Sequence, residues 1–242
     1  MEFLGRVLAA FARGLAKPGS FRLADFGVVF SRAGAEAVPV TLLVGFLLGF
    51  IIAYMSAVML GKFGAEIYVA NLVGVALVRE LGTIVAAIVL ASRSASAFAA
   101  ELGAMVVNDE IAAMKTMGID PVAYLAAPRI AAGALALPLL ALFAILAGLA
   151  GGGVTLALYG YTARVFLANA FSFCGVGDLL ASLGKGVVFG ALIAGVGCQR
   201  GLETGQGADA VGKATTSAVV SAIVLFIAVD GLFALILSAT GA

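Results

Sequence analysis

The chain has 242 residues, of which 63% are hydrophobic and only 11% are charged. A soluble domain of this length carries about twice that charge, so the composition indicates a polytopic membrane protein and excludes an ordinary soluble enzyme. The net charge of +1 gives no basis for binding nucleic acid. Histidine is absent, and Cys174 and Cys198 fall at opposite ends of one predicted span. The sequence therefore predicts neither a metal site nor a disulfide.

The first 36 residues are predicted to form an interfacial segment that leads into the first membrane span. Apolar and basic side chains recur at helical spacing over residues 1–17, which predicts a basic amphipathic helix lying in the headgroup layer. A cleaved signal peptide is the alternative, but Glu2 and Arg13 interrupt the pattern that such a peptide needs. We therefore expect an interfacial segment over residues 1–36 and a single transmembrane domain over residues 37–242.

Five long apolar segments follow, and each is long enough to cross the hydrocarbon core as a helix. They cover residues 37–61, 67–100, 130–159, 179–198 and 214–240. The short link 62–66 allows only a tight reversal, so the first two spans form an antiparallel hairpin. The sequence thus predicts an all-α membrane protein.

Basic residues are concentrated on one side of this predicted topology. The segments on the side of the N-terminus hold Arg6, Arg13, Lys17, Arg22, Arg32, Arg93, Lys115, Arg129, Arg200 and Lys213, and the opposite segments hold Lys62, Arg164 and the boundary residue Lys185. The positive-inside rule then places the N-terminus in the cytoplasm and the C-terminus on the outer side.

Arg79 and Glu80 are the only ionised side chains between Ile67 and Ser92. A charge near the bilayer centre costs about 2.5–3.5 kcal/mol on insertion scales, so it normally faces a protein interior or a wet cavity. Neighbours on a helix point about 100° apart, so the two side chains do not pair with each other and each needs another partner. The pair either neutralises charges on neighbouring helices or lies on a transport path.

A pocket for an amphiphile is predicted next to this pair. Met59, Leu60 and Phe63, at the outer end of the first span, supply apolar surface, Arg79 and Glu80 supply the charged end, and Leu81 next to them is also predicted to line the lipid path. Asp230 in the fifth span and Lys185 in the fourth are further predicted buried charges. Lys185 is close enough to its span's end to extend toward the interface, and Arg79 or Lys185 are both possible partners for Asp230.

A short amphipathic helix is predicted over residues 106–117, between the second and third spans. Its candidate docking residues are Val107, Asp109, Glu110, Ile111, Met114, Lys115 and Met117. Acidic residues at its start and a methionine-bearing apolar face are typical of a helix that docks in a partner's groove. A helix resting on lipid is the alternative. Gly118 fits its C-terminal cap, and Asp120-Pro121 fits the start of the next helix.

The loop after the fourth span contains a misleading motif. Residues Gly207 to Lys213 match the G-x-x-x-x-G-K pattern of a phosphate-binding loop. However, Ala214 stands where a Ser or Thr would hold magnesium, and a membrane span rather than a buried strand precedes the motif. Nucleotide binding by this chain is therefore not expected.

Several short motifs together resemble the MlaE/YrbE permeases, which are membrane subunits of ABC transporters that work with MCE-domain proteins on lipid traffic. The resemblance runs from about Ala37 to Leu237 and is carried by Arg79-Glu80-Leu81-Gly82, by Ala91-Ser92-Arg93-Ser94-Ala95-Ser96-Ala97 leading to Ala100-Glu101-Leu102-Gly103, by Met117-Gly118-Ile119-Asp120-Pro121 with Pro128-Arg129, by Gly212-Lys213-Ala214-Thr215-Thr216 and by Val229-Asp230. One departure is Thr83, where the family often has proline, so the bend of the second span is open.

The resemblance implies that an N-terminal elbow helix and five spans form one half of a homodimer in the bacterial inner membrane. It implies that the helix over residues 106–117 couples to a separate ABC-type ATPase, which holds ATP and magnesium, while this chain has no cofactor and no catalytic residue. It also implies that Arg79 and Glu80 belong to a path for phospholipid, exchanged with a periplasmic MCE-domain protein.

Two other classes of function remain open at this point. An ion-coupled secondary transporter could use Arg79, Glu80 and Asp230 as a relay, but such proteins show inverted repeats, and the two halves of this sequence show no convincing repeat. A membrane-embedded enzyme needs a nucleophile with a base or a metal cluster, and without histidine the candidates are few.

Overall fold

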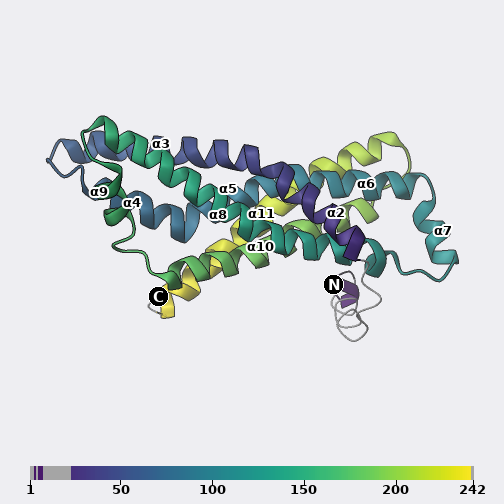
Figure 1. The fold of residues 1–242 in the computed structure, drawn as a ribbon. Helices are drawn as coiled ribbons and strands as arrows, with labels where there is room; N and C mark the ends of the chain where they lie inside the picture. Colours follow the sequence, from purple (N-terminus) through teal and green to yellow (C-terminus); the bar gives the residue numbers. More distant parts are fainter. Residues whose placement is uncertain (1–2, 4, 8–22, 241–242) are drawn as a thin grey trace. The chain divides into compact units, whose positions relative to one another are not determined.

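The computed structural model describes residue 3, residues 5–7 and residues 23–240 (Figure 1). All secondary structure assigned in these ranges is helical. Five of the helices are long and apolar enough to cross a membrane, and they cover Phe26–Gly61, Tyr68–Val107, Val122–Leu158, Val176–Leu202 and Asp209–Ile236. The predicted all-α architecture with five spans is confirmed at this level. Most of the predicted interfacial helix, residues 1–17, lies outside the described residues.

The long helices are composed of shorter elements. The first contains α2 (Leu23–Ala33), the 3₁₀ turn η2 (Ala35–Ala37) and α3 (Val38–Gly61). The second contains α4 (Tyr68–Ala76), the π-helical turn η3 (Leu77–Leu81), α5 (Gly82–Leu90), the π-helical turn η4 (Ala91–Ala95) and α6 (Ser96–Val107). The π-helical turn η5 (Val122–Ala126) leads into α8 (Ala127–Leu158), and α10 (Val176–Leu202) and α11 (Ala208–Thr240) are the last two spans. Two short helices, α7 (Glu110–Thr116) and α9 (Ala163–Ala170), lie between spans.

The second long helix is interrupted twice by a π-helical turn. At the end of η3 the N–H of Gly82 donates to the carbonyl oxygen of Leu77, five residues back rather than four. Such a turn inserts an extra residue into a helix and is frequent at functional sites. Arg79 and Glu80 lie on η3 and Arg93 lies on η4, so three of the four charged residues of this helix fall on its irregular turns, and the fourth, Glu101, lies on α6. The helix continues through Thr83.

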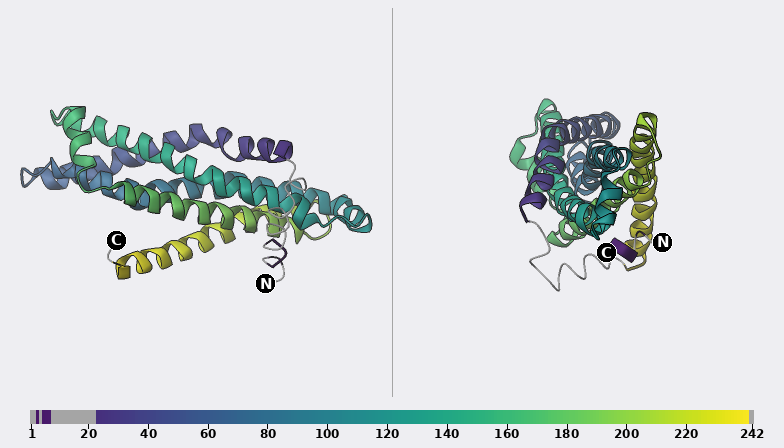
Figure 2. Two further views of the ribbon diagram at one scale, coloured as in Figure 1. Left: turned by 60° about the horizontal axis from the view of Figure 1, so that its bottom comes forward. Right: turned by 90° about the vertical axis from the view of Figure 1, so that its right-hand side faces the viewer.

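The chain divides into two compact units, and each is described by itself. Unit 1 comprises residues 1–36, 90–136 and 187–242, and unit 2 comprises residues 37–89 and 137–186. In unit 1, α6 lies along α11, as both Figure 1 and Figure 2 show. Phe189 on α10 contacts Phe226 and Phe233 on α11, with ring centroids 5.8 and 6.0 Å apart. These aromatic contacts join the last two spans.

The core of unit 2 is built around α4, which packs against α3 and α9. Val69, Val73 and Leu77 on the second long helix and Phe166 on α9 are buried in this core. Helix α9 follows α8 in the chain and lies beside α4 (Figure 1). The segment after α9 then leads into the start of α10. This arrangement brings the beginning of α10 close to η3.

Glycines allow α3 and α8 to touch through their backbones in unit 2. A Cβ at Gly45 would lie 2.7 Å from the carbonyl oxygen of Ala144. A Cβ at Gly49 would overlap the carbonyl of Gly148, and one at Gly151 would overlap that of Phe46. In lipid, where the hydrophobic effect does not drive helices together, such close approach supplies packing energy.

The predicted helix over residues 106–117 differs from the observed one. Val107 still belongs to α6, and the chain turns at Asn108 and at Asp109, which has a positive φ of 59°. Helix α7 then spans only Glu110–Thr116. The sequence pattern joined two helices because Val106 and Val107 continue the apolar face across the turn. Gly118 follows with φ +75°, and the N–H of Val122 donates to Asp120 Oδ1 at 3.1 Å.

The glycine contact between α3 and α8 gives a direct prediction. Replacing Gly49 with Ala places a methyl group against the Gly148 backbone, which cannot yield as a side chain would. We expect a loss of about 1–3 kcal/mol, the usual cost of overpacking, visible as a lower melting temperature of the detergent-solubilised protein. Gly184→Ala on α10 is the control, because a Cβ there meets nothing within 4 Å. Equal melting temperatures for the two variants would contradict the packing argument.

Candidate functional site

Three polar contacts join η3 and the start of α5 to α10 within unit 2. Arg79 Nη2 lies 2.9 Å from Asp178 Oδ1, and Lys185 Nζ lies 2.6 Å from Glu80 Oε2. A third contact joins the hydroxyl groups of Thr83 and Ser182 at 2.7 Å. We call these three contacts the polar ladder. Each charge of the Arg79-Glu80 pair therefore finds its own partner on another helix.

Helical spacing explains how α10 supplies all three partners. Asp178, Ser182 and Lys185 are four and then three residues apart, so their side chains share one face of α10. Asp178 lies in the first turn of the helix, where a carboxylate also interacts favourably with the helix dipole. It accepts a hydrogen bond from the N–H of Gly175 at 2.8 Å, which holds the entry to the helix.

The side chains of the polar ladder differ in solvent exposure. The side chains of Arg79 and Asp178 are 44% and 20% exposed, whereas Lys185 is only 3% exposed and its partner Glu80 is 39% exposed. Thr83 and Ser182 are each only 1% exposed, and their hydroxyl groups form a hydrogen bond with each other. The expectation that Lys185 extends to the interface is wrong, because its ammonium turns inward to Glu80.

An apolar pocket of about 300 Å³ borders the ladder in unit 2. Val78 and Leu179, the neighbours of Arg79 and Asp178 in sequence, both contribute to its wall. The other lining residues come from α8 and from the segment that precedes α10: Leu142, Ile145, Leu146, Leu149, Phe171, Cys174, Gly175 and Val176. Apart from the Cys174 thiol the wall is formed by apolar residues, and the Arg79–Asp178 ion pair lies one residue along the chain from Val78 and Leu179 in that wall.

The apolar residues predicted to face Arg79 and Glu80 occupy other places. Leu60 and Leu81 pack against the core of unit 2. Met59 and Phe63 are 63% and 84% exposed, and the wall of the pocket beside Arg79 comes from α8, α10 and the segment between α9 and α10 instead. A role for these four residues in a lipid path stays a prediction.

Asp178, Ser182 and Thr83 are the site residues that sequence reasoning missed. Asp178 falls just outside the predicted fourth span, 179–198, and the two hydroxyl residues carry no charge that would mark them in an apolar run. The spacing of Asp178, Ser182 and Lys185 on one helix face was the available signal. Asp230, one of the predicted partners for Arg79 or Lys185, lies on α11 in unit 1, and its pairing stays a prediction.

Cys174 lies in the segment before α10, and the charges of Asp178 and Arg79 both affect the pKa of its thiol. Burial raises the pKa of its thiol, the nearby Asp178 carboxylate raises that pKa further, and Arg79 opposes both effects. The thiol therefore stays protonated at neutral pH. In the described part of the chain no group of three or more His, Cys, Asp and Glu side chains is placed to hold a metal ion.

The predicted docking helix also differs in which residues it exposes. Ile111 and Met114 on α7 are buried within unit 1, so the apolar face that the sequence assigned to a partner packs against the chain itself. Asp109, Glu110, Lys115 and Met117 are exposed, with Met117 at 67%. Any partner that docks on α7 therefore meets a mainly charged surface with one methionine.

Comparisons with known proteins place these features in a family. Residues 28–236 match the protein family described as Permease MlaE. A probable ABC transporter permease protein of Synechocystis sp. is 36% identical over 194 residues, which are 80% of this chain and 74% of that protein. One of Rickettsia typhi is 33% identical over 195 residues, 80% of this chain and 75% of that protein. The chloroplastic protein TRIGALACTOSYLDIACYLGLYCEROL 1 of Arabidopsis thaliana is 35% identical over 199 residues, 81% of this chain and 57% of that protein.

The Glu80–Lys185 contact predicts a non-additive pair of substitutions. Glu80→Gln removes the negative charge 2.6 Å from a buried ammonium, and we expect a destabilisation of about 1–3 kcal/mol. The double variant Glu80→Gln/Lys185→Met removes both charges and should recover most of this loss, since an apolar replacement of a buried pair is often neutral. Thermal unfolding in detergent measures both, and additive losses would show that the two groups do not interact.

The alkylation rate of Cys174 tests the Arg79–Asp178 pair. In a Cys198→Ala background, Asp178→Asn removes a charge that raises the thiol pKa, so the thiolate fraction at pH 8 and the rate with iodoacetamide should increase. Arg79→Gln removes a charge that lowers this pKa and should slow the reaction. Rates measured from pH 7 to 10 give the pKa directly. Shifts in the same direction for both variants would contradict the observed arrangement.

Proposed function

The chain belongs to the MlaE permease family, and from that premise we propose that it moves phospholipid or a similar amphiphile between the inner membrane and a periplasmic MCE-type carrier. It is an ABC transporter permease, a non-catalytic subunit. ATP and magnesium are then held by a separate ATPase subunit, and the work of this chain is to bind the cargo and change shape. The lipid named in the Arabidopsis thaliana relative supports a lipid cargo.

The observation that carries this proposal is the ion pair at the edge of an apolar pocket. A phospholipid needs a cation for its phosphate and an apolar wall for its acyl chains, and Arg79 and the adjoining pocket supply both. Arg79 is 44% exposed, so its guanidinium is accessible to a ligand even while it contacts Asp178. A small ion would have no use for the apolar wall.

Arg79 and Glu80 then have different tasks in the proposed path. A lipid phosphate that approaches Arg79 competes with Asp178 for the same guanidinium. Cargo binding therefore exchanges one anion for another, and Arg79 keeps a negatively charged partner throughout. Glu80 holds Lys185, which is buried and fixes α10 against the second long helix. Cargo binding would thereby act on the start of α10 and leave its middle anchored.

Movement of the ATPase would reach this chain through α7. The exposed residues Asp109, Glu110, Lys115 and Met117 offer charges and one apolar contact, and the buried Ile111 and Met114 tie the helix to unit 1. A helix that is anchored inward and charged outward transmits a push from a partner without detaching. The remaining parts of the proposal are a homodimer, a cytoplasmic N-terminus and a periplasmic C-terminus, and they rest on the family and on the distribution of basic residues.

An ion-coupled secondary transporter fits the molecule less well. Membership of a family of ABC permeases assigns the energy source to ATP instead.

Purification from cells followed by a transfer assay tests the proposal. The tagged chain should retain a stoichiometric ATPase, and the complex should transfer labelled phospholipid to its carrier when ATP is added. Arg79→Gln should lower that transfer at least about tenfold, since a charge-assisted phosphate contact contributes about 1.5–3 kcal/mol, while the ATPase remains bound. A chain that is active without any ATPase would overturn the proposal.

A matched pair of substitutions tests the pocket. Leu146 and Leu158 are both exposed leucines on α8, at 61% and 72%, but only Leu146 lines the pocket. Leu146→Trp should fill part of the cavity and reduce lipid transfer several-fold, while Leu158→Trp should leave it unchanged. Equal transfer by the two variants would show that cargo does not use this pocket.

A further inference from the structure

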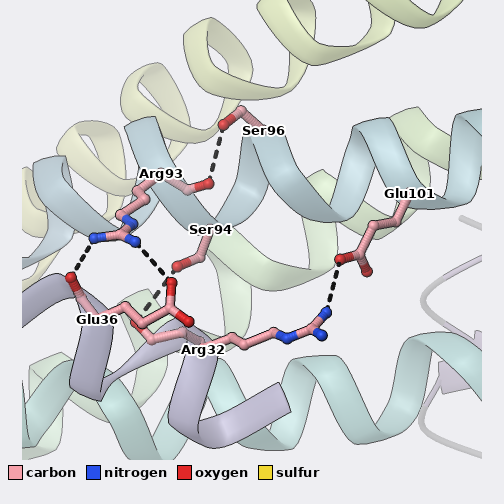
Figure 3. A network of polar contacts seen from close by, with 7 residues as sticks. Arg32, Glu36, Arg93, Ser94, Ser96 and Glu101 are labelled. Carbon is pink, nitrogen blue, oxygen red and sulfur yellow. Dashed lines mark hydrogen bonds and ion pairs between the residues drawn. The ribbon is translucent and has the colours of Figure 1, made fainter. Parts of the chain in front are cut away.

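A second polar cluster lies in unit 1 and takes no part in the polar ladder. Its five charged side chains converge on a pocket of about 230 Å³ and come from α2, η2, η4, α6 and α8: Arg32, Glu36, Arg93, Glu101 and Arg129. We call it the arginine pocket, and Figure 3 shows four of these side chains. Neither the proposed lipid path nor the proposed ATPase contact uses these residues.

One side of the arginine pocket is closed by Arg93 and Glu36. Arg93 donates through Nη1 to the main-chain oxygen of Glu36 and through Nη2 to Glu36 Oε2 at 2.8 Å (Figure 3). This two-point contact ties the π-helical turn η4 to the junction of α2 and α3. It satisfies both members, so this pair forms a wall and does not attract a ligand.

The other carboxylate is shared between two arginines. Glu101 Oε2 accepts a hydrogen bond from Arg129 at 2.9 Å. Its Oε1 lies 3.8 Å from Arg32 Nη1 (Figure 3). The longer separation exceeds hydrogen-bond distance, so this contact uses none of the N–H donors of Arg32. Three guanidinium groups face two carboxylates, which leaves the pocket with one unmatched positive charge. That charge is most accessible at Arg32, whose side chain is 66% exposed.

Arg129 adds a largely buried guanidinium group to the arginine pocket. Its Nη1 donates to the carbonyl oxygen of Leu125 at 3.0 Å, and its guanidinium lies 5.9 Å from the centre of the Phe98 ring. Its side chain is only 13% exposed, and among the described residues its Nε–H is buried without a hydrogen-bond partner. Because this Nε has almost no accessible surface, it does not line the pocket, and Arg129 contributes positive charge there and not a free donor.

The rest of the arginine pocket is apolar. Val29 and Ala33 on α2 and Ala97 and Phe98 on α6 complete its lining. An oxygen-rich anion with a single negative charge matches the cluster's charge, and an attached apolar portion matches the lining. Arg93 is also one of the basic residues that the predicted topology places on the N-terminal side of the membrane, where lipid headgroups lie. A phosphodiester headgroup has all of these properties.

We propose that the arginine pocket binds the phosphate of an anionic phospholipid as a bound lipid of the fold, distinct from the transported cargo. The lipid's phosphate contacts the guanidinium of Arg32 and lies beside Arg129, and its glycerol end lies against Val29 and Phe98. Bound there, it clamps α2 to α6 and neutralises the cluster. The proposal goes beyond lipid transport, because a permease for any cargo could hold such a lipid.

The chain contains no tryptophan, which makes a fluorescence test possible. Val29→Trp introduces one tryptophan at the lining of the arginine pocket, and brominated phospholipids quench it on contact. In mixed micelles, brominated phosphatidylglycerol should bind about fivefold more tightly than brominated phosphatidylcholine, since one basic residue near anionic lipid contributes about 1 kcal/mol. Adding Arg32→Gln should abolish this preference, and Arg32→Lys should retain most of it. Arg164→Gln, at an exposed arginine of α9, is the matched control and should leave the preference intact.

Inorganic phosphate distinguishes the two possible sources of the anion. In one outcome the two lipids quench equally, but millimolar phosphate raises the melting temperature of the parent and not of the Arg32→Gln variant. The pocket then binds phosphate, and the source is free inorganic phosphate in place of a lipid headgroup. The proposal is overturned if neither lipid headgroup nor inorganic phosphate distinguishes Arg32→Gln from the parent. Because binding and not transport is measured, this result is independent of the test of the transport proposal.

Discussion

The contact between Lys185 and Glu80 is the constraint on which the arrangement of unit 2 depends. An ammonium that is only 3% exposed in an apolar helix has a high cost unless a counter-charge lies next to it, and Glu80 Oε2 is 2.6 Å away. Satisfying this one group fixes the rotation of α10 relative to η3, because any turn of either helix would separate the pair. Once that rotation is fixed, Ser182 meets Thr83 and Asp178 meets Arg79 as a consequence of helical spacing.

Backbone irregularity makes this contact possible. The π-helical turn η3 carries Arg79 and Glu80, and the π-helical turn η4 carries Arg93, so the second long helix departs from regular geometry at three of its four charged residues. The departure from the family pattern at Thr83 has a related effect. Proline there would supply no side-chain hydrogen bond, whereas the threonine hydroxyl meets Ser182 and forms the middle contact of the polar ladder.

Much of the fold could be predicted from the sequence, because the signal for a membrane span is the absence of charge over a long segment and needs no partner. The special status of Arg79 and Glu80 followed from the same rule. Their partners could not be predicted, since Asp178 precedes the apolar run of its helix and falls outside the predicted span 179–198. The packing of α9 beside α4, which brings Asp178 next to Arg79, is a tertiary contact without a local signal. The error at α7 has a similar origin: the apolar face of Ile111 and Met114 is real, but the sequence does not say whether a partner or the chain itself covers it.

The polar ladder also separates two roles that the sequence left joined. A charged pair inside a membrane can hold helices together or can contact a ligand, and adjacent residues invite one explanation for both. The exposures differ along α10, from the accessible Arg79–Asp178 pair, through the fully buried hydroxyl pair, to Lys185. A ligand can exchange with a contact that water already reaches, but removing Glu80 from Lys185 would expose a buried charge to an apolar surrounding. We therefore infer that Glu80 acts mainly by positioning α10, and that Arg79, next to the apolar pocket, is the residue of the pair that meets the cargo.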